Sequence, residues 1–193
     1  MQRTHDIPRK QPPEERAQDH TRLAELFAQF MNKTLQQRLV VGMPEARAYD
    51  LTLSQAQTLR FLYLHGTVYV GEIADGLDTS YPSATNMVTR LEEKGLVRRV
   101  TVPEDRRAVE VVLTDCGRAL AQKLEEERRA GFHRILERMP PEERDALLAG
   151  LRRFVSLAVD ADAGVADEIC LRCGWRASSD CPLAEVIPLS ACR

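Results

Sequence analysis

The chain of 193 residues contains few aromatic residues and no long apolar run. Aromatic residues make up 5% of the sequence and hydrophobic residues 44%, which predicts a respectable core that is mostly aliphatic. No apolar run approaches the ~20 residues needed to cross a bilayer. The first twenty residues also lack the apolar middle of a secretory signal. We therefore expect a protein of the cytoplasm with no membrane partner.

The sequence also lacks a catalytic constellation. Its histidines, His5, His20, His65 and His133, are scattered, and no two have the spacing of a helical metal site. There is no glycine-rich loop of the kind that holds phosphate groups. We therefore do not expect an enzyme.

The most informative part of the chain runs from Ser54 to Thr114. Apolar residues recur at helical spacing in two segments, first around Leu59 and Leu62 and then around Ile73. A third helix and a basic hairpin follow. Helix, turn, helix and hairpin in this order are typical of small domains that read duplex DNA.

The third helix has clear end signals and two different faces. Ser80 is a good N-cap and Pro82 suits the first turn, while Gly95 suits a left-handed cap at the other end. Ala84, Met87, Val88 and Leu91 are expected to pack inward. The residues expected to face outward have short hydrogen-bonding side chains or a cation, and they are Ser80, Tyr81, Ser83, Thr85, Asn86, Thr89 and Arg90. Such side chains reach base edges and phosphates when a helix lies in a major groove.

Two β-branched runs, 96–102 and 108–113, flank a polar turn and predict a hairpin. Arg98 and Arg99 lie on the first run, and Arg106 and Arg107 lie at the tip. From Ser80 to Arg107 there are six basic and four acidic residues, so this segment has a net charge of +2 in a chain of net charge −2. A locally basic module suits a polyanionic partner.

These residues form a recognisable pattern. It reads Leu77-x-x-Ser80-Tyr81-Pro82-Ser83-Ala84-Thr85-x-x-Val88-x-Arg90-Leu91-Glu92-Glu93-Lys94-Gly95-Leu96-Val97-x-Arg99, then Glu104-Asp105-Arg106-Arg107 and Leu113-Thr114-x-x-Gly117. The pattern resembles the winged helix of the multiple antibiotic resistance regulator (MarR) family. The resemblance covers roughly residues 20–158 and is densest between Leu51 and Leu120.

The resemblance implies a homodimeric transcription factor, in many members a repressor, that binds a palindromic operator in double-stranded DNA. It implies that Asp105 braces an arginine of the wing, here Arg107. Arg106 is then the residue that reaches the minor groove. Phosphate contacts from Arg98 and Arg99 are expected to supply much of the affinity.

Three amphipathic segments lie outside the winged helix, at residues 23–35, 120–139 and 147–155. Their apolar stripes either close the core of one chain or form a core shared by two chains. We favour the shared core, because terminal helices beside a small winged helix otherwise leave apolar faces in water. The charged run 125–129 is interpreted as a solvated helix face with local ion pairs.

The expected fold class is mainly α with a small β-wing, a winged helix-turn-helix flanked by N- and C-terminal dimerisation helices. The expected segments are a disordered arm at 1–19, an N-terminal dimerisation helix at 20–50, the DNA-binding domain at 51–114, C-terminal dimerisation helices at 115–158 and a cysteine-rich tail at 159–193.

Four of the five cysteines lie in the last 24 residues, with the spacing C-x2-C-x7-C-x10-C. They are Cys170, Cys173, Cys181 and Cys192, and the first two are close enough in sequence to share a metal ion. A tail this short cannot bury a core of its own, so a metal is a reasonable organiser. This tail is not part of the usual MarR pattern.

The spacing of the tail cysteines does not determine which metal or cluster they bind. Zinc held by four thiolates predicts a structural site, and an iron–sulfur cluster predicts a sensor. The spacing closely fits neither the zinc signature nor the iron–sulfur signature. A third interpretation is that the cysteines are free or disulfide-forming thiols. Cys116, at the start of a long helix, is either a redox switch or a small packed residue.

Two kinds of signal are compatible with this organisation: a small-molecule effector in the cleft between dimer helices and winged helix, or a redox or metal change at the tail. The alternative function is a metal-dependent protein-interaction or electron-transfer module in which the winged helix is only structural. The polar face of the third helix and the arginine-tipped wing argue against that alternative.

Overall fold

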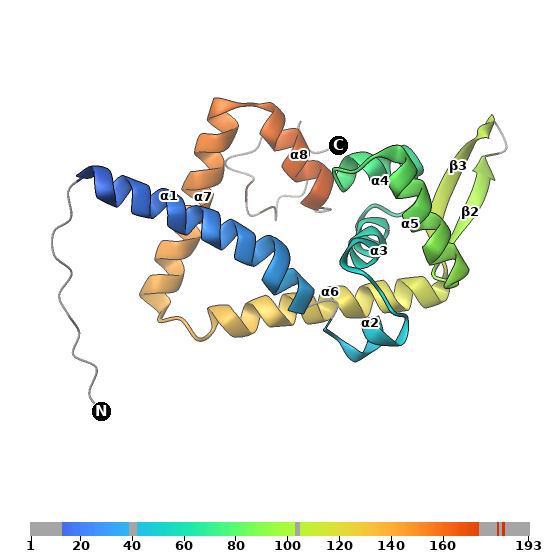
Figure 1. Ribbon diagram of the computed structural model, residues 1–193, viewed down its shortest axis with the longest axis horizontal. Helices are drawn as coiled ribbons and strands as arrows, with labels where there is room; N and C mark the ends of the chain where they lie inside the picture. Colours follow the sequence, from blue (N-terminus) through green and yellow to red (C-terminus); the bar gives the residue numbers. More distant parts are fainter. Residues whose placement is uncertain (1–12, 39–41, 103–104, 174–180, 182, 184–193) are drawn as a thin grey trace.

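The computed structural model describes residues 13–38, 42–102, 105–173, 181 and 183 (Figure 1). The elements are α1 (Pro13–Gln29), the π-helical segment η1 (Phe30–Leu35), α2 (Pro44–Ala48), α3 (Leu53–His65), β1 (Val68–Tyr69), α4 (Val70–Gly76), α5 (Tyr81–Glu93), β2 (Val97–Val102), β3 (Asp105–Leu113), α6 (Asp115–Leu136), α7 (Pro141–Ala161) and α8 (Gly164–Cys173). A helical chain with one small sheet confirms the predicted fold class. None of the described helices is long and apolar enough to cross a membrane.

The sheet is antiparallel, with the strand order β1-β3-β2. Val111 of β3 faces Val68 of β1 on one side and Arg99 of β2 on the other. The β2–β3 hairpin projects from the helical body as the wing (Figure 1). This hairpin was predicted, whereas β1 was not, because a strand of two residues is too short to show a periodicity.

The buried centre of the winged helix is aliphatic, as the composition predicts. Its largest fully buried apolar side chains are Leu59, Leu62, Ile73, Val88, Leu91, Leu96, Val97 and Val111. They come from α3, α4, α5, the sheet and the residue before β2. Buried side chains of α2 and α6, among them Ala46 and Leu124, belong to the same core. The winged helix therefore shares its core with α2 and the first half of α6.

Local chemistry fixes both ends of α5. The Ser80 hydroxyl accepts a hydrogen bond from the Ser83 N–H at 3.3 Å, and Pro82 lies in the first turn. At the other end Gly95 has φ +70°, a conformation that disfavours side chains. Gly117 at the start of α6 lies against the Leu96 carbonyl, where an added Cβ would come within 1.8 Å of the oxygen. The position and length of α5 are thus set by nearby residues.

The N-terminal boundary differs from the prediction. The disordered arm was expected to extend to residue 19, but α1 begins at Pro13. Proline at the first helical position and the two glutamates that follow it suit a first helical turn. Residues 1–12 of that arm lie outside the described part of the chain. The first half of the predicted tail is also helical, since α8 covers Gly164–Cys173.

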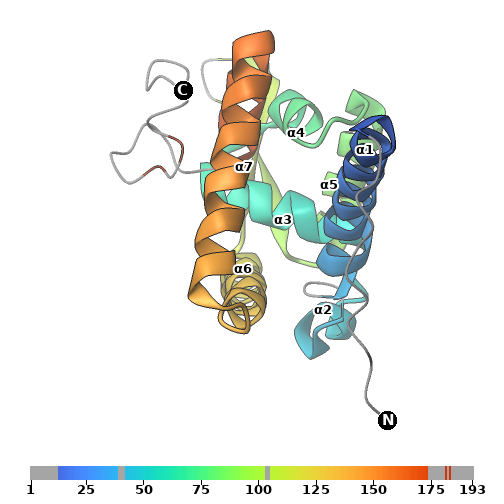
Figure 2. The ribbon, with the colours of Figure 1, turned by 90° about the vertical axis from the view of Figure 1, so that its left-hand side faces the viewer.

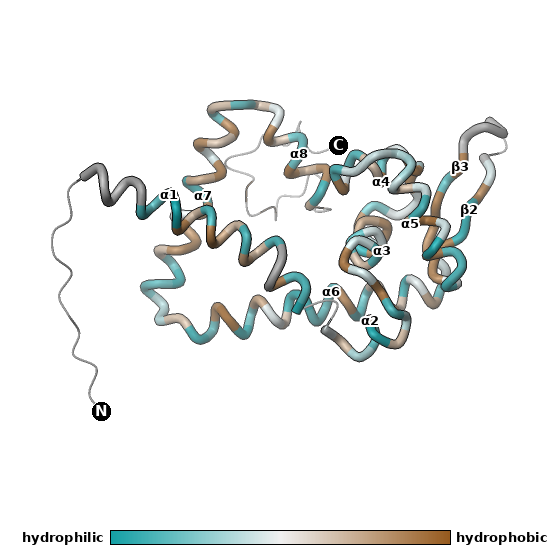
Figure 3. The backbone as a smooth tube through the Cα atoms, viewed as in Figure 1, coloured by the Kyte–Doolittle hydropathy of each residue, from teal (hydrophilic) through white to brown (hydrophobic). Residues whose placement is uncertain are grey.

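The terminal helices leave much of their apolar surface exposed. Figure 2 shows α1 and α7 on opposite sides of the molecule, and Figure 3 shows hydrophobic positions recurring along both. The most exposed of these side chains are Leu23 at 67% and Phe154 at 68%. The other large ones are Leu26, Phe27, Phe30, Ile135, Leu148, Leu151 and Leu157. The stripes therefore do not close the core of a single chain.

The interpretation of residues 125–129 as a solvated face is wrong for Glu125. Its side chain is only 4% exposed, whereas Glu126 and Glu127 are exposed as expected. Glu125 follows the buried Ala121 by one helical turn, so it faces α3 rather than water. A charged residue in this position needs partners.

Three arginines supply those partners. Glu125 accepts hydrogen bonds from Arg60 Nε at 3.0 Å, from Arg128 Nε and Nη2 at 2.8 and 2.7 Å, and from Arg129 Nε at 3.0 Å. Burial by itself raises the pKa of Glu125, but the hydrogen bonds from Arg128 and the charges of Arg128 and Arg60 outweigh it and lower the pKa to about 2. The carboxylate therefore stays ionised and joins α3 to α6.

We predict that Glu125→Gln lowers the free energy of unfolding by about 3 kcal/mol at neutral pH, because it removes the buried charge that pairs with the half-buried guanidinium groups of Arg60 and Arg128. The pKa of this carboxyl is lower in the folded than in the unfolded protein. The contribution of the ionised carboxylate to the free energy of unfolding is therefore complete when the pH is above the ordinary glutamate pKa. It is lost as the pH falls from there towards 2. Urea unfolding at several pH values measures the difference.

The matched control is Glu127→Gln on the same helix, where the side chain is exposed. Its effect on stability should be within about 0.5 kcal/mol. Equal stabilities of the Glu125→Gln protein and the unsubstituted protein at neutral pH, or a difference that does not shrink in acid, would contradict the assigned role of the network.

Candidate nucleic-acid interface

The α5 helix has the two faces that its sequence predicts. Ala84, Val88 and Leu91 are fully buried and Met87 is partly buried. On the other face Ser80, Tyr81, Ser83, Asn86 and Arg90 are exposed, and Thr85 and Thr89 are half-buried. The helix therefore presents a polar surface to solvent along its whole length.

Hydrogen bonds within the protein divide these polar residues into two groups. Thr85 Oγ1 donates to the Tyr81 carbonyl at 2.9 Å, and Thr89 Oγ1 donates to the Thr85 carbonyl at 3.0 Å. The Ser80 and Ser83 hydroxyls bond to each other at 2.8 Å. Within the described residues, the side chains of Tyr81, Asn86 and Arg90 make no hydrogen bond. These three residues have polar groups available for a partner.

A shallow recess of about 220 Å³ lies between this face and the start of α3. It is lined by Thr52, Gln55, Ser83, Asn86, Met87 and Arg90. Thr52 and Gln55 form a capping box, with hydrogen bonds of 3.1 and 3.3 Å. Sequence reasoning missed these two residues, although a threonine followed three residues later by a glutamine is the pattern of such a box. A helix N-terminus beside α5 extends the surface that suits phosphate groups.

The two neighbouring arginines of β2 have different environments. The Arg98 side chain is exposed. The Arg99 guanidinium forms an ion pair with Glu92 and donates from Nη2 to Thr89 Oγ1 at 2.8 Å. Arg99 thus ties the wing to α5. Phosphate contact by either residue stays a prediction, but only Arg98 has its charge open to solvent.

The predicted residues of the wing tip are placed only in part. Asp105, Arg106 and Arg107 begin β3. Their side chains lie outside the described part of the structure. Bracing of Arg107 by Asp105 and minor-groove contact by Arg106 therefore remain predictions.

The loop before α3 is anchored to the end of α5 and the start of α6. Lys94 Nζ donates to the carbonyls of Tyr49 and Asp50, the second at 2.9 Å. The Tyr49 hydroxyl lies 3.0 Å from Cys116 Sγ, and this hydrogen bond raises the pKa of Tyr49. Cys116 is exposed and is not in a disulfide. Its role as a redox switch stays a prediction.

The tail cysteines are described only in part. Cys170 and Cys173 lie on α8, and Cys181 is described as a single residue beyond it. Among the described residues, no three metal-ligating side chains gather at one point. Cys192 lies outside the described residues. Metal binding at this tail stays a prediction.

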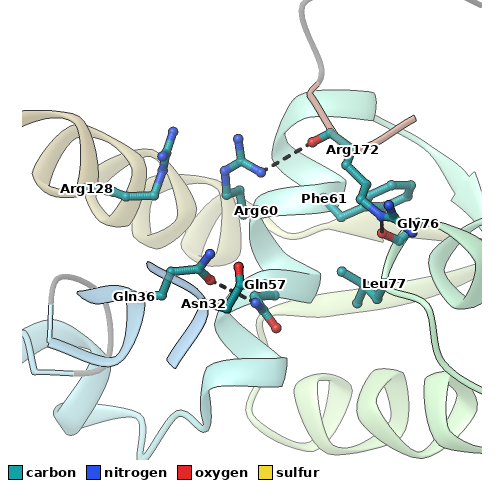
Figure 4. A pocket seen from close by; sticks show the side chains of 9 residues that line it. All are labelled: Asn32, Gln36, Gln57, Arg60, Phe61, Gly76, Leu77, Arg128 and Arg172. Atoms are coloured by element: carbon teal, nitrogen blue, oxygen red, sulfur yellow. Dashed lines mark hydrogen bonds between the residues drawn. The ribbon is translucent and has the colours of Figure 1, made fainter. Parts of the chain in front are cut away.

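A second site, whose lining residues the sequence did not predict, lies between α3 and the elements that flank the winged helix. It is a cavity of about 350 Å³ lined by Asn32, Gln36, Gln57, Arg60, Phe61, Gly76, Leu77, Arg128 and Arg172 (Figure 4). The lining residues come from η1, α3, α4, α6, α8 and the segments beside them. No local sequence pattern can reveal a site whose parts are separated by more than a hundred residues.

Comparisons with known proteins agree with this geometry. Residues 49–108 match the sequence profile of the MarR family. YfiV of Bacillus subtilis, an uncharacterised HTH-type transcriptional regulator, is 36% identical over 102 residues, which cover 53% of this chain and 64% of YfiV. The chain therefore spans slightly less than two thirds of the length of that relative.

A further relative and a solved structure complete the comparison. YwaE of Bacillus subtilis, also an uncharacterised HTH-type regulator, is 30% identical over 122 residues, which cover 62% of this chain and 71% of YwaE. FabT of Streptococcus pneumoniae, solved in complex with DNA, has the same fold with a TM-score of 0.63 at 23% identity over 74% of this chain and 99% of that chain. YfiV and YwaE are regulators, which confirms that the chain is not an enzyme. The chain belongs to the MarR family of transcriptional regulators.

Proposed function

We propose that the protein is a cytoplasmic transcriptional regulator that binds a palindromic operator as a homodimer and represses by excluding polymerase. The observation that carries this proposal is the exposed polar face of α5 beside a basic wing. Three α5 side chains have polar groups available for a partner, namely Tyr81, Asn86 and Arg90. Because they lie on one helix, they can enter a major groove together. The FabT structure with DNA supports it as a case in which the same fold binds a duplex.

The contacts divide by chemistry. An asparagine side chain pairs with the major-groove edge of adenine, and an arginine pairs with guanine or a phosphate. Asn86 and Arg90 are therefore proposed to read sequence. Arg98 is exposed on the wing and is proposed to bind phosphate, while Arg106 is proposed to reach the minor groove.

The homodimer is supported by the exposed apolar stripes of α1 and α7. Contiguous apolar surface of this kind on a soluble protein marks an interaction site. A second copy of the chain supplies matching stripes, and twofold symmetry then presents two copies of α5 to two half-sites of a palindrome. The terminal helices thus set the distance between the two DNA-reading helices.

Selection of bound duplexes from a random pool tests DNA recognition. We expect the protein to enrich a palindrome. Asn86→Ala should relax the preference at one position in each half-site, at a cost of about 1–3 kcal/mol. Arg98→Ala should instead weaken binding to all sequences alike. It should also lower the number of counterions released on binding by about one per protomer, which reduces the salt dependence of the affinity. Arg106→Ala should also weaken binding.

Arg47→Ala serves as the control, because Arg47 is exposed on α2 and lies outside the α5 face. It should leave the enriched sequence unchanged. If no duplex is enriched at moderate salt, the proposal is contradicted and the alternative of a protein-interaction or electron-transfer module is favoured. An unaltered profile for Asn86→Ala would remove only the assigned role of that residue.

We predict that Phe154→Glu makes the protein monomeric, because it places a charge in the most exposed part of the α7 stripe. Sedimentation equilibrium measures the change. Arg152→Glu, at an exposed position on the same helix, tests for the effect of a new charge alone. A monomeric unsubstituted protein, or a dimer that survives Phe154→Glu and Leu151→Glu together, would contradict the assigned dimer surface.

The signal is proposed to be either a small molecule or a metal or redox change at the tail. Zinc or an iron–sulfur cluster at Cys170, Cys173, Cys181 and Cys192 rests on the sequence spacing alone. We expect metal analysis of protein purified without oxygen to find zinc, or iron with sulfide, and to find less in a Cys170→Ser, Cys173→Ser protein. Equal metal content in the unsubstituted and the doubly substituted protein would contradict the proposal that the tail binds a metal.

A further inference from the structure

The helix α8 fastens the C-terminal tail to the winged helix. Its C-terminal end lies beside α4 (Figure 1). Leu171 packs against the aliphatic core, and Arg172 Nε donates to the Gly76 carbonyl at 3.3 Å. In the other direction, Arg60 Nη1 donates to the Arg172 carbonyl at 3.4 Å (Figure 4). The tail helix is therefore joined to both α3 and α4.

This contact depends on the least stable turn of a short helix. The α8 helix has 10 residues, and isolated helices shorter than ~12 residues are marginal in water. The carbonyls of a last helical turn also have no partner within the helix. Leu171 and Arg172, which make the contact, both belong to that turn. Anything that stabilises the last turn of α8 therefore strengthens its contact with the winged helix.

The same turn carries two thiols. Cys170 and Cys173 are three residues apart on α8, a spacing that places their side chains on one face. The Cys173 thiol donates to the Cys170 carbonyl at 3.5 Å, so its sulfur lies over the turn that Cys170 begins. Both residues are partly exposed, and neither is in a disulfide. The two thiols therefore lie on one side of the helix and can be reached from solvent.

The thiols and the Arg172 guanidinium lie on different faces of α8. Cys170 and Cys173 follow the buried Ala166 by four and seven positions, so these three residues share a face. Arg172 instead follows Glu168 by four positions, and its Nη1 donates to that carboxylate at 3.1 Å. A cation held by the thiols is thus on the other side of the helix from this guanidinium. The partial negative charge at the C-terminal end of a helix also favours a cation there.

We propose that Cys170 and Cys173 form a two-thiolate site for a soft divalent cation, and that the bound cation staples the last turn of α8 and so holds this helix on the winged helix. Soft cations prefer thiolate ligands. Metal–sulfur distances of ~2.3 Å bring two sulfurs to about 4 Å from each other, which side chains one helical turn apart can reach. Binding releases the thiol protons and forms two metal–sulfur bonds, so no oxidant is needed.

This inference deepens the proposed metal signal at the tail and rests on the proposed function where it treats the ion as a signal for DNA binding. It assigns the site to a single cation rather than to an iron–sulfur cluster. A cluster takes about four thiolates, whereas among the described residues no three metal-ligating side chains gather at one point. Two thiolates on one helical turn suffice for a single ion whose other positions are filled by water.

The Arg172 contact connects this site to the DNA-reading helix. Gly76, whose carbonyl accepts from Arg172, is the last residue of α4, and α5 begins at Tyr81. At its other end α8 follows α7, which carries the exposed apolar stripe proposed for the dimer. A stapled α8 therefore restricts the movement of the winged helix relative to α7, and with it the distance between the two copies of α5 in a dimer.

Titration of the reduced, metal-free protein with Cd²⁺ tests the site. Cd²⁺ represents the soft cation, because thiolates that bind it give an ultraviolet charge-transfer band. We expect this band to saturate at one Cd²⁺ per chain. Cys170→Ser, Cys173→Ser should weaken Cd²⁺ binding by at least about 10-fold, because even an outer partner of a metal ligand contributes that much. Cys116→Ser is the matched control, since this exposed cysteine lies on α6, and it should leave binding unchanged.

Amide hydrogen exchange tests the staple. Cd²⁺ should slow exchange in residues 74–79, at the end of α4, by about 3-fold or more, because the contact with α8 opens less often. The Leu171→Ala, Arg172→Ala protein keeps both thiols and a good helix-forming sequence. It should therefore retain the cadmium band but lose the slowing of exchange in residues 74–79.

Several outcomes would overturn the inference. They are the absence of a cadmium band, an equal band in the doubly serine-substituted protein, equal slowing of exchange in the Leu171→Ala, Arg172→Ala protein, and iron with sulfide in protein purified without oxygen.

Operator binding with and without Cd²⁺ tests regulation. The ion should change the operator affinity of the unsubstituted protein by about 3-fold or more, but not that of the Cys170→Ser, Cys173→Ser protein. An operator affinity that Cd²⁺ leaves unchanged would contradict the role of the ion as a signal. Cd²⁺ binding through these thiols by a protein that selects no duplex would support the site and contradict the proposed function.

Discussion

The buried carboxylate of Glu125 is the interaction on which the arrangement of this molecule depends. It lies between α3 and α6 and accepts hydrogen bonds from three guanidinium groups. Because one carboxylate cannot neutralise three cations, the same contact that holds the winged helix to the long helix leaves a positive wall beside it. The ion network therefore fixes Arg60 and Arg128 in place and leaves positive charge that the one carboxylate does not balance.

The parts of the fold that could be predicted from the sequence are those governed by neighbouring residues. The start of α5 at Ser80, its end before Gly95 and the two faces between them follow from capping chemistry and helical spacing. The hairpin follows from two β-branched runs and a polar turn. These signals act over a few residues, so they are present in the sequence before any tertiary contact forms.

The parts that could not be predicted depend on which residue meets which across the fold. Arg98 and Arg99 look equivalent in sequence, but strand alternation directs Arg99 to Glu92 and Thr89 of α5 and leaves Arg98 in solvent. The charged run 125–129 looks like an ordinary solvated face, and only the position of α3 makes Glu125 a buried partner of Arg60. The cavity combines positions from 32 to 172, which no spacing rule relates.

The winged helix and the terminal helices differ in how complete they are. The winged helix shares one closed aliphatic core with α2 and the first half of α6, while α1 and α7 keep apolar stripes in solvent. A unit with a closed core moves as a rigid body, because close-packed side chains resist deformation. Any change where this unit meets α8 and the second half of α6 therefore turns α5 as a whole rather than distorting it. The Glu125 network and the Arg172 contact with Gly76 lie at that border, so a change in either contact has the largest effect on the orientation of α5.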